Sequence, residues 1–226
     1  MKGLFEMKAM GRKAAGVIAL AFLTAACGEA PSGGQAAAPT GAPIETRYEQ
    51  TEVGGFAIGN PEAPVQILEF GSFSCPHCTH FHEEVLPKLK EKYVDNGLVH
   101  FEFRSFVANG PDLLATMVVA CEGAERFESL ADLFFARMGG EVAWRSSDDP
   151  NGYVADLARR AGIPTARFQA CQADAGQREK VMAMRQQAIN EYDLRGTPTI
   201  IVNGKKRDNV NEWIDLDQLV QALLTQ

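Results

Sequence analysis

Two hydrophobic patterns alternate in the first half of the chain. Residues 65–70 form an almost continuous apolar run, which is typical of a strand buried on both faces in a parallel sheet. From residue 76 to residue 94 the apolar side chains recur about every fourth position and predict a helix. Residues 98–103 alternate between apolar and polar side chains and predict a second strand. The order predicts a β-α-β unit with parallel strands and a right-handed crossover.

The predicted helix at residues 76–94 contains Pro87 in its interior. Proline has no N–H to donate, and its ring crowds the preceding turn of the helix. We therefore expect a kink at Pro87.

Helical patterns fill the middle of the chain, residues 109–193. The expected helices cover residues 113–124, 127–138, 153–161, 165–173 and 177–192, with breaks at several glycine and proline residues. The aromatic residues of this region are assigned to the hydrophobic core: Phe127, Phe134, Phe135 and Phe168.

A β pattern returns near the C-terminus. Residues 199–202 predict a strand, and Asn203-Gly204 predicts a tight hairpin turn into residues 205–207. Residues 215–224 predict a closing amphipathic helix. The fold class is therefore α/β, with an all-helical segment between a β-α-β part and a β-β-α part.

Composition and charge narrow the function. Asp and Glu number 29 against 22 Lys and Arg, a net charge of -7, so no nucleic-acid partner is expected. Hydrophobic residues make up 46% of the 226 positions, enough for a core. Beyond the N-terminus no apolar run is long enough to span a bilayer, so we expect membrane contact only through the N-terminus. The protein is expected to be a monomer.

Residues 1–27 have the pattern of an export signal. A positively charged region precedes an apolar run at residues 14–26 that is too short to cross a bilayer comfortably. The run ends in Ala25-Ala26-Cys27, which resembles the lipobox of bacterial lipoproteins, although Thr24 stands where that pattern prefers Leu. The resemblance implies lipidation of Cys27. An ordinary cleaved signal and an uncleaved anchor are the alternatives, and each version exports the domain to an oxidising compartment.

Residues 28–47 are expected to be a flexible linker. The stretch up to residue 43 is rich in Gly, Ala, Pro, Ser and Thr and has almost no large apolar residue. A linker of this kind reaches about 20–25 Å, enough to hold a domain just off a membrane surface. Folded structure is expected from residue 48 onwards.

The candidate chemistry lies at Cys75-Pro76-His77-Cys78, where the first strand passes into the helix. Two cysteines at this spacing and position are typical of a redox motif. At a helix N-terminus, unpaired N–H groups and the helix dipole favour a thiolate at Cys75. Cys78 lies one turn further and is expected to be shielded.

A structural disulfide or half of a zinc site is the alternative for these cysteines. His77, His80 and His82 are close in sequence, but His80 and His82 lie on different helix faces and are assigned to the surface. No second pair with the spacing of zinc ligands exists in the chain. We therefore expect neither a metal nor another cofactor.

These motifs resemble the DsbA-type branch of the thioredoxin superfamily. The resemblance rests on Leu68-Glu69-Phe70 before the cysteine pair, and on Gly196-Thr197-Pro198-Thr199 before Val202-Asn203-Gly204. It implies a thioredoxin-like fold with an inserted all-helical domain. The thioredoxin-like parts would be residues 48–108 and 194–226, and the insertion residues 109–193.

The resemblance also implies roles for single residues. Pro76 and His77 would tune the potential of the pair, although His77 could instead be an exposed residue without a role. The family's matching glutamate accepts a proton beneath the second cysteine; Glu69 could do so or could be a strand-end residue reaching solvent. The family often has another acid soon after the second cysteine, where this chain has His82.

Thr197-Pro198 resembles the cis-proline loop of the superfamily, although the sequence does not fix the isomer. In that loop the Thr197 backbone would bind an extended substrate by strand addition, with little dependence on substrate sequence. The two remaining cysteines, Cys121 and Cys171, lie in the helical insertion. They are either a structural disulfide, as in some DsbA-type relatives, or buried free thiols.

The expected function is an exported thiol:disulfide oxidoreductase that introduces disulfides into extracytoplasmic proteins. A substrate thiolate would attack the Cys75–Cys78 bond, and Cys78 would then resolve the mixed disulfide at Cys75. The substrates would be unfolded or reduced exported proteins, the reoxidant a quinone-linked membrane protein of the DsbB type, and the location the periplasm. A reductase or isomerase is the alternative enzyme, and a non-catalytic binding module or metal chaperone the alternative outside enzymes.

Overall fold

The computed structural model describes residues 46–141 and 143–226. The expected signal, the lipidation expected at Cys27 and most of the expected linker lie outside the described residues. Thr46, near the end of the expected linker, contacts the folded part of the chain, because its hydroxyl donates a hydrogen bond to Asp95 at 2.7 Å. Within the described part of the chain, no helix has both the length and the apolar character needed to cross a bilayer.

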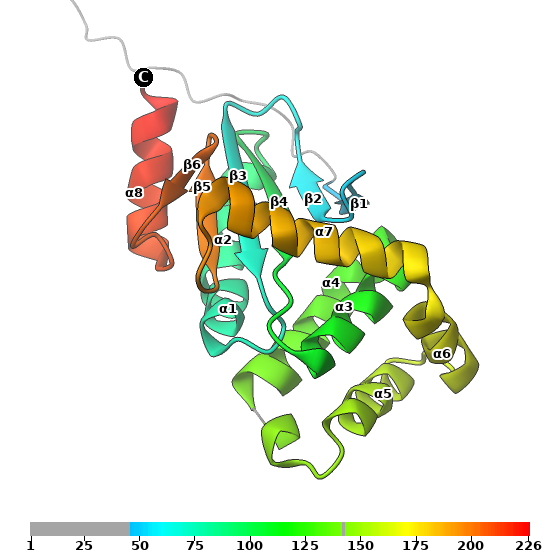
Figure 1. Cartoon of the computed structure of the whole chain (residues 1–226). Coiled ribbons are helices and arrows are strands. Elements are labelled where there is room, and N and C mark those ends of the chain that lie inside the picture. The colour runs from blue at the N-terminus through cyan, green and yellow to red at the C-terminus, as the bar shows by residue number, and fades with distance from the viewer. Residues whose placement is uncertain (1–45, 142) are drawn as a thin grey trace, which may run out of the picture. The chain divides into compact units, whose positions relative to one another are not determined.

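A six-stranded mixed sheet forms the centre, in the order β1-β2-β4-β3-β5-β6 (Figure 1). The strands are β1 (Glu49–Gln50), β2 (Phe56–Gly59), β3 (Val65–Gly71), β4 (Val99–Ser105), β5 (Thr199–Val202) and β6 (Lys205–Arg207). β3 and β4 are parallel along their whole length, from the pair Val65 and Val99 to the pair Gly71 and Ser105. The predicted β-α-β unit is confirmed, and β3 lies between β4 and β5.

Strands β1 and β2 were not predicted. β2 pairs antiparallel with β4, and β1 adds two residues to its outer edge. β2 contains Ala57 and Gly59, so its four residues give too little alternation to indicate a strand. Its position depends on pairing with β4, a long-range contact that local periodicity does not record.

The first helix is divided into four segments. They are α1 (Pro76–His80), the π-helical turn η1 (Phe81–Val85), α2 (Leu86–Leu89) and the π-helical turn η2 (Lys90–Val94). The Leu86 N–H donates to the carbonyl of Phe81, five residues back, immediately before Pro87. A π turn is one of the known responses to an interruption of the helix ladder. The helix is therefore interrupted by a wide turn immediately before Pro87, while the expected kink stays a prediction.

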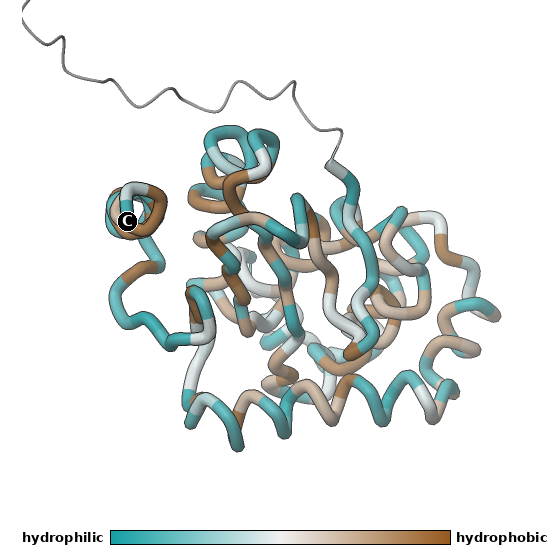
Figure 2. The backbone as a smooth tube through the Cα atoms, turned by 90° about the horizontal axis from the view of Figure 1, so that it is seen from above, coloured by the Kyte–Doolittle hydropathy of each residue, from teal (hydrophilic) through white to brown (hydrophobic). Residues whose placement is uncertain are grey.

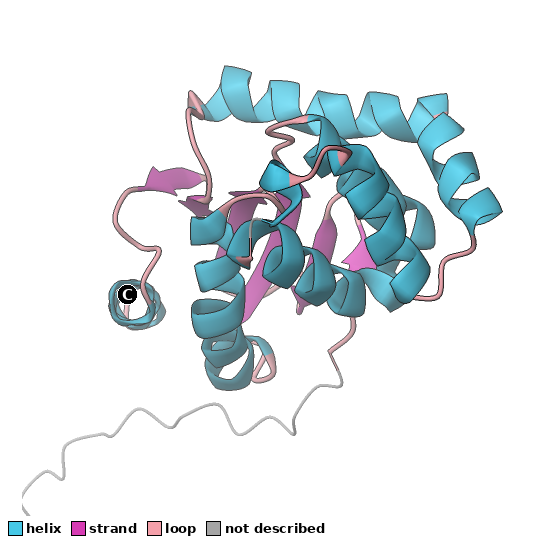
Figure 3. Cartoon of the chain, turned by 90° about the horizontal axis from the view of Figure 1, so that it is seen from below, coloured by secondary structure: helices cyan, strands magenta, loops and turns pink. Residues whose placement is uncertain are grey.

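Helices of the insertion pack beside and across the sheet (Figures 1 and 3). They are α3 (Gly110–Glu122), α4 (Ala124–Phe134), the π turn η3 (Phe135–Gly140), the 3-10 turn η4 (Ala143–Ser146), α5 (Pro150–Arg160), α6 (Thr165–Ala173) and α7 (Ala175–Tyr192). Phe127, Phe134 and Phe135 are fully buried in the main core, and Phe168 packs against it partly buried. The long helix α7 crosses one face of the sheet and is largely hydrophilic (Figures 1 and 2).

The C-terminal part follows its prediction closely. Asn203 and Gly204 both have positive φ, 48° and 74°, as a tight hairpin between β5 and β6 requires. The closing helix α8 (Trp213–Leu224) buries Leu216 and Val220 completely. The apolar face of α8 is part of the main hydrophobic core.

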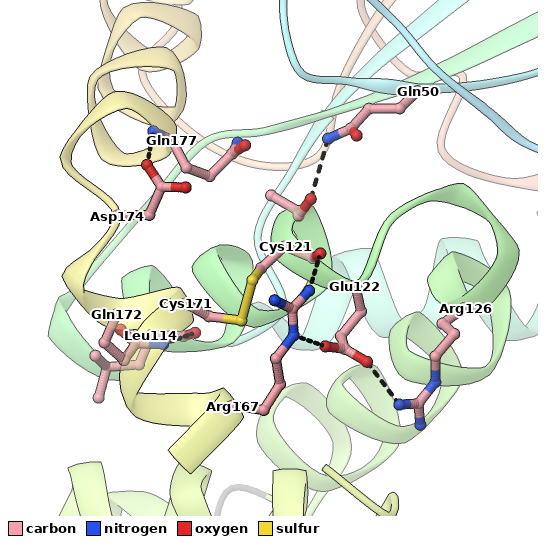
Figure 4. The surroundings of a disulfide bond; sticks show 11 residues. Gln50, Leu114, Cys121, Glu122, Arg126, Arg167, Cys171, Gln172, Asp174 and Gln177 are labelled. Carbon is pink, nitrogen blue, oxygen red and sulfur yellow. Dashed lines mark hydrogen bonds and ion pairs between the residues drawn. A yellow bond between two sulfur atoms is a disulfide. The ribbon is translucent and has the colours of Figure 1, made fainter. Parts of the chain in front are cut away.

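A disulfide joins Cys121 at the end of α3 to Cys171 in α6 (Figure 4). Beside it, the Glu122 carboxylate accepts hydrogen bonds from Arg126 at 2.7 Å and from Arg167 at 2.9 Å. Arg167 also donates to the Cys121 carbonyl at 2.9 Å. The covalent bond and the Arg167 contacts fasten α6 to α3, and the Arg126 ion pair joins α4 to α3.

We predict that replacing both Cys121 and Cys171 by serine lowers the free energy of unfolding. The bond closes a loop with a sequence separation of 50, and a crosslink of this span stabilises by about 2–4 kcal/mol, mainly by restricting the unfolded chain. Urea unfolding of the double variant and of wild type, both with Cys75 and Cys78 oxidised, measures the difference. Equal midpoints would contradict the prediction.

The insertion approaches the cysteine-bearing helix most closely at Gly139 of η3. A Cβ at this position would lie 1.9 Å from the Thr79 hydroxyl and 2.9 Å from the Cys75 carbonyl. The Thr79 hydroxyl itself donates to the Phe135 carbonyl at 3.0 Å. Only glycine therefore allows η3 and α1 to pack at this distance.

We predict that Gly139→Ala destabilises the protein by about 1–3 kcal/mol, because the added methyl group must displace backbone of the cysteine-bearing helix. Gly140→Ala is the matched control, since its Cβ would make only ordinary contacts at 3.6 and 3.8 Å. Thermal or urea unfolding of both variants tests this. Similar stability of the two variants would refute the assigned packing constraint.

Candidate active site

Cys75 and Cys78 lie at the start of α1 in unlike surroundings. Cys75 is the N-cap residue of the helix, in an extended conformation, and is half-buried. Cys78 is completely buried. Both are free thiols, and the Cys75 Sγ donates to the carbonyl oxygen of Thr197 at 3.2 Å. A reagent from solvent can therefore reach Cys75 but not Cys78.

The surroundings of Cys75 favour its thiolate. A hydrogen bond with the Cys78 thiol lowers the pKa of Cys75 most, to about 5 from 9.0, against the opposing effect of burial. The Thr197 side chain and the backbone N–H groups of Cys78 and His77 lower this pKa further. The N–H contribution is the one expected at the first turn of a helix.

Cys78 has the opposite tendency. Burial raises its pKa well above 9.0, and the nearby charges of Glu69 and Cys75 raise it further. The backbone N–H of Ser72 contacts the Cys78 Sγ at 3.5 Å and acts in the other direction. At neutral pH the pair therefore consists of a half-buried thiolate at Cys75 and a buried thiol at Cys78.

Glu69 is buried in the central strand, with 1% of its surface exposed. Its neighbours in register are Phe103 of β4 and Ile200 of β5. Oε1 has no hydrogen-bond partner among the described residues, and burial raises the Glu69 pKa from 4.5 to about 8. The side chain lies over Gly71, where a Cβ would be 2.8 Å from Oε1. The alternative that Glu69 reaches solvent is therefore wrong.

The loop before β5 faces Cys75. The Thr197–Pro198 peptide bond is cis, and the Thr199 hydroxyl donates to the Gly196 carbonyl at 2.8 Å. The Thr197 carbonyl points at the Cys75 sulfur, so residues separated by more than a hundred positions meet here. Arg195 is exposed and pairs with Asp193 at 3.1 Å.

The comparisons with known proteins agree with this geometry. The sequence model of the family described as Thioredoxin matches residues 51–222, which includes the cysteine pair and the loop before β5. The chain belongs to the thioredoxin family.

Curated relatives of this thioredoxin-family chain have names that refer to disulfide chemistry. A putative protein-disulfide oxidoreductase of Rickettsia felis is 27% identical over 67% of this chain and 54% of its own length. The disulfide bond formation protein D of Bacillus subtilis is 26% identical over 74% of this chain and 76% of its own length. The chain thus spans about half the length of the Rickettsia relative.

Solved structures show the same fold. The protein-disulfide isomerase of Novosphingobium aromaticivorans is 25% identical, with a TM-score of 0.65, over 76% of this chain and 98% of its own. The α-DsbA1 of Wolbachia pipientis is 23% identical, with a TM-score of 0.66, over 80% of this chain and 92% of its own. The thioredoxin-like fold with a helical insertion, expected from the sequence, is confirmed.

The three histidines near the cysteines of this thioredoxin-family chain have different environments. His77 and Pro76 are exposed, and His80 contacts Glu212 at 3.1 Å at the surface. His82, which we had assigned to the surface, is buried: 8% is exposed, its ring packs on Phe135, and Nε2 is 2.9 Å from Asp132. The helical insertion covers this position, which the helix pattern alone does not reveal.

Sequence reasoning missed the polar residues that support the cysteine helix. The completely buried Asp112 accepts hydrogen bonds from the loop that precedes Cys75. Arg145 of η4 donates to the Ser74 carbonyl at 2.8 Å, one residue before Cys75. The helix predicted from residue 113 onwards does not include Asp112, and nothing in the sequence places Arg145 here.

We predict that Glu69 makes the stability of the reduced protein depend on pH. Its folded-state pKa is raised from 4.5 to about 8, so its contribution is fully present below pH 4.5 and is lost as the pH rises towards 8. Glu69→Gln removes this loss, and the variant should gain stability relative to wild type steadily between about pH 4.5 and pH 8. Urea unfolding at several pH values measures the gap.

Glu62→Gln is the control for this measurement, because Glu62 is an exposed residue just before the same strand. It should follow wild type at every pH. A constant difference between Glu69→Gln and wild type across the range would mean that the buried carboxyl group is not the source of the pH dependence.

Proposed function

We propose that this protein is an extracytoplasmic thiol:disulfide oxidase that works through Cys75 and Cys78. The observation that carries the proposal is the unequal pair at the start of α1: a half-buried Cys75 whose pKa is about 5 beside a completely buried Cys78. The Thr197 carbonyl that faces Cys75, and the names of the relatives, support the same interpretation.

The oxidising half-reaction begins with the pair as a disulfide. A substrate thiolate attacks the Sγ of Cys75, a substrate–Cys75 bond forms, and the Cys75–Cys78 bond breaks with its electron pair going to the Cys78 sulfur. This sulfur is buried and its pKa is high, so it takes up a proton. The Glu69 carboxyl, with a pKa of about 8, is a nearby proton source.

Electron balance changes the next step from the one expected for Cys78. Attack of Cys78 on Cys75 would re-form the enzyme disulfide and return the substrate reduced. Oxidised product forms instead when a second substrate thiolate attacks the substrate sulfur of the mixed disulfide. Cys75 then leaves as a thiolate, and its low pKa makes it a good leaving group. Cys78 is therefore the leaving sulfur of the first step. Its attack on Cys75 also releases reduced substrate from mixed disulfides that do not go on to product.

The low pKa of Cys75 also sets the direction of transfer. A stabilised thiolate makes the reduced enzyme more stable relative to the disulfide, so the disulfide becomes a stronger oxidant. A reductase needs the reverse balance. The pair therefore favours donation of a disulfide to unfolded or reduced exported proteins over its removal.

Substrates would be held by the loop before β5. In the reduced protein the Cys75 thiol donates to the Thr197 carbonyl, whereas in a disulfide Cys75 has no thiol proton and this carbonyl is free to accept a backbone N–H. Backbone pairing depends little on sequence, so a wide range of extended chains fits. His77 and Pro76, exposed between the cysteines, would adjust the potential.

The remaining parts of the proposal concern location and partners. The export signal and the lipidation of Cys27 would place the domain in the periplasm on a linker at the membrane. A quinone-linked membrane protein of the DsbB type would reoxidise the pair there. These assignments rest on the N-terminal sequence and on the family resemblance.

The test combines oxidation of a reduced, unfolded protein substrate with redox titration of the Cys75–Cys78 pair. We expect an oxidising potential and loss of activity in Cys75→Ser. Cys78→Ser, which has no disulfide to donate, should also be inactive, and after reaction with oxidised glutathione it should keep a mixed disulfide at Cys75 that no second cysteine resolves. The double variant of Cys121 and Cys171 is the control and should keep its activity. Turnover that survives Cys75→Ser refutes the oxidase, and a strongly reducing potential favours the reductase.

A further inference from the structure

Asp112 is a completely buried carboxylate outside the cysteine pair. It lies in the first turn of α3, where Asn109 caps the helix by accepting the Asp112 N–H at 3.0 Å. The hydrogen bonds of the Asp112 side chain, however, go to residues outside α3. Oδ2 accepts the Ser72 hydroxyl at 2.7 Å and the Ala108 N–H at 2.8 Å, and Oδ1 accepts the Phe73 N–H at 3.0 Å.

These hydrogen bonds hold the segment between β3 and Cys75. Asp112 accepts hydrogen bonds from the Ser72 hydroxyl and from the Phe73 N–H, so it holds the Ser72 side chain and the peptide group that follows Ser72. The Ser72 hydroxyl also lies 3.0 Å from the Ser74 hydroxyl and accepts the Ser74 N–H at 3.2 Å. The segment therefore has little freedom to rotate.

The fixed segment carries a donor that faces the buried sulfur. The Ser72 N–H points at the Cys78 Sγ over 3.5 Å. Apart from the influence of Cys75, two effects act on the Cys78 sulfur: its burial and the nearby charge of Glu69. Both disfavour the Cys78 thiolate. The Ser72 N–H opposes them, and an N–H donor stabilises an anion more strongly than a neutral thiol.

We propose that Asp112 is a positioning residue for Cys78. By holding Ser72 and Phe73 it keeps the Ser72 N–H aimed at the Cys78 sulfur, and it thereby stabilises the thiolate that forms there during disulfide exchange. This inference rests on the proposed function, because it concerns one step of that reaction. It also gives the helical insertion a part in the chemistry, since Asp112 belongs to α3.

Reaction of the reduced protein with oxidised glutathione isolates this step. The Cys75 thiolate first attacks a glutathione sulfur, forms a Cys75–glutathione bond and releases one glutathione thiolate. The Cys78 thiolate then attacks the Cys75 Sγ, the Cys75–Cys78 bond forms, and the second glutathione leaves as a thiolate. The first rate follows the ionisation of Cys75, and the second follows the ionisation and placement of Cys78.

Asp112→Asn keeps the size of the side chain but turns one acceptor into a donor that faces Ser72, Phe73 or Ala108. We expect the second rate to fall about tenfold at pH 7, the effect of a rise of about one unit in the pKa of Cys78. Its pH profile should shift upwards, while the first rate stays within about twofold of wild type. Quenching with acid and separating the glutathione adduct measures both rates.

Ser72→Ala is the second variant, because it removes one donor to Asp112 but keeps the Ser72 N–H. It should slow the second rate about threefold and decides the question if Asp112→Asn does not fold. Asp149→Ala is the matched control. Asp149 caps α5 by accepting the Gly152 N–H at 2.9 Å, so its loss weakens the insertion without touching the segment before Cys75.

Two results would overturn the inference: an unchanged pH profile of the second rate in every folded variant, or equal slowing by Asp149→Ala. Both are distinct from failure of the proposed function, which would appear in wild type as a strongly reducing potential or as turnover that survives Cys75→Ser.

Discussion

The difference in burial between the two sulfurs governs the whole site. Cys75 is half-buried and Cys78 is completely buried, although only two residues separate them. In water the two thiols would ionise alike, whereas here burial raises the pKa of one and hydrogen bonds lower that of the other. In the proposed reaction, the order of bond making and breaking follows from this difference, because Cys75 is the sulfur that a substrate can reach and Cys78 is the sulfur that leaves.

Three parts of the chain that lie far apart in sequence create this difference. The central strand β3 provides Glu69, the loop before β5 provides the Thr197 carbonyl, and the helical insertion provides Asp112 and the close approach of Gly139. The insertion therefore does more than enlarge the protein. It covers α1 and holds the segment before Cys75, so its packing determines the environment of the reacting atoms.

Much of the fold and part of the site can be predicted from the sequence, for a physical reason. Local hydrophobic periodicity predicts the elements whose burial it reflects: β3, β4, the β5–β6 hairpin and α8. The spacing of the two cysteines predicts redox chemistry. β2, the burial of His82 and the role of Asp112 depend on contacts with distant segments, which leave no periodic pattern. Glu69 is intermediate: its position in an apolar strand was visible, but only the neighbouring strands decide whether its carboxyl group meets water.

The bond between Cys121 and Cys171 has a consequence for how the protein matures. It lies in the same chain as the redox pair, yet 50 positions separate its two cysteines, and each new chain must acquire it by oxidation. If the protein donates disulfides, a newly exported copy is itself a substrate for copies made earlier. The first molecules in a compartment would then mature slowly and later ones faster, and each transfer would leave the donor pair reduced until an external oxidant restores it.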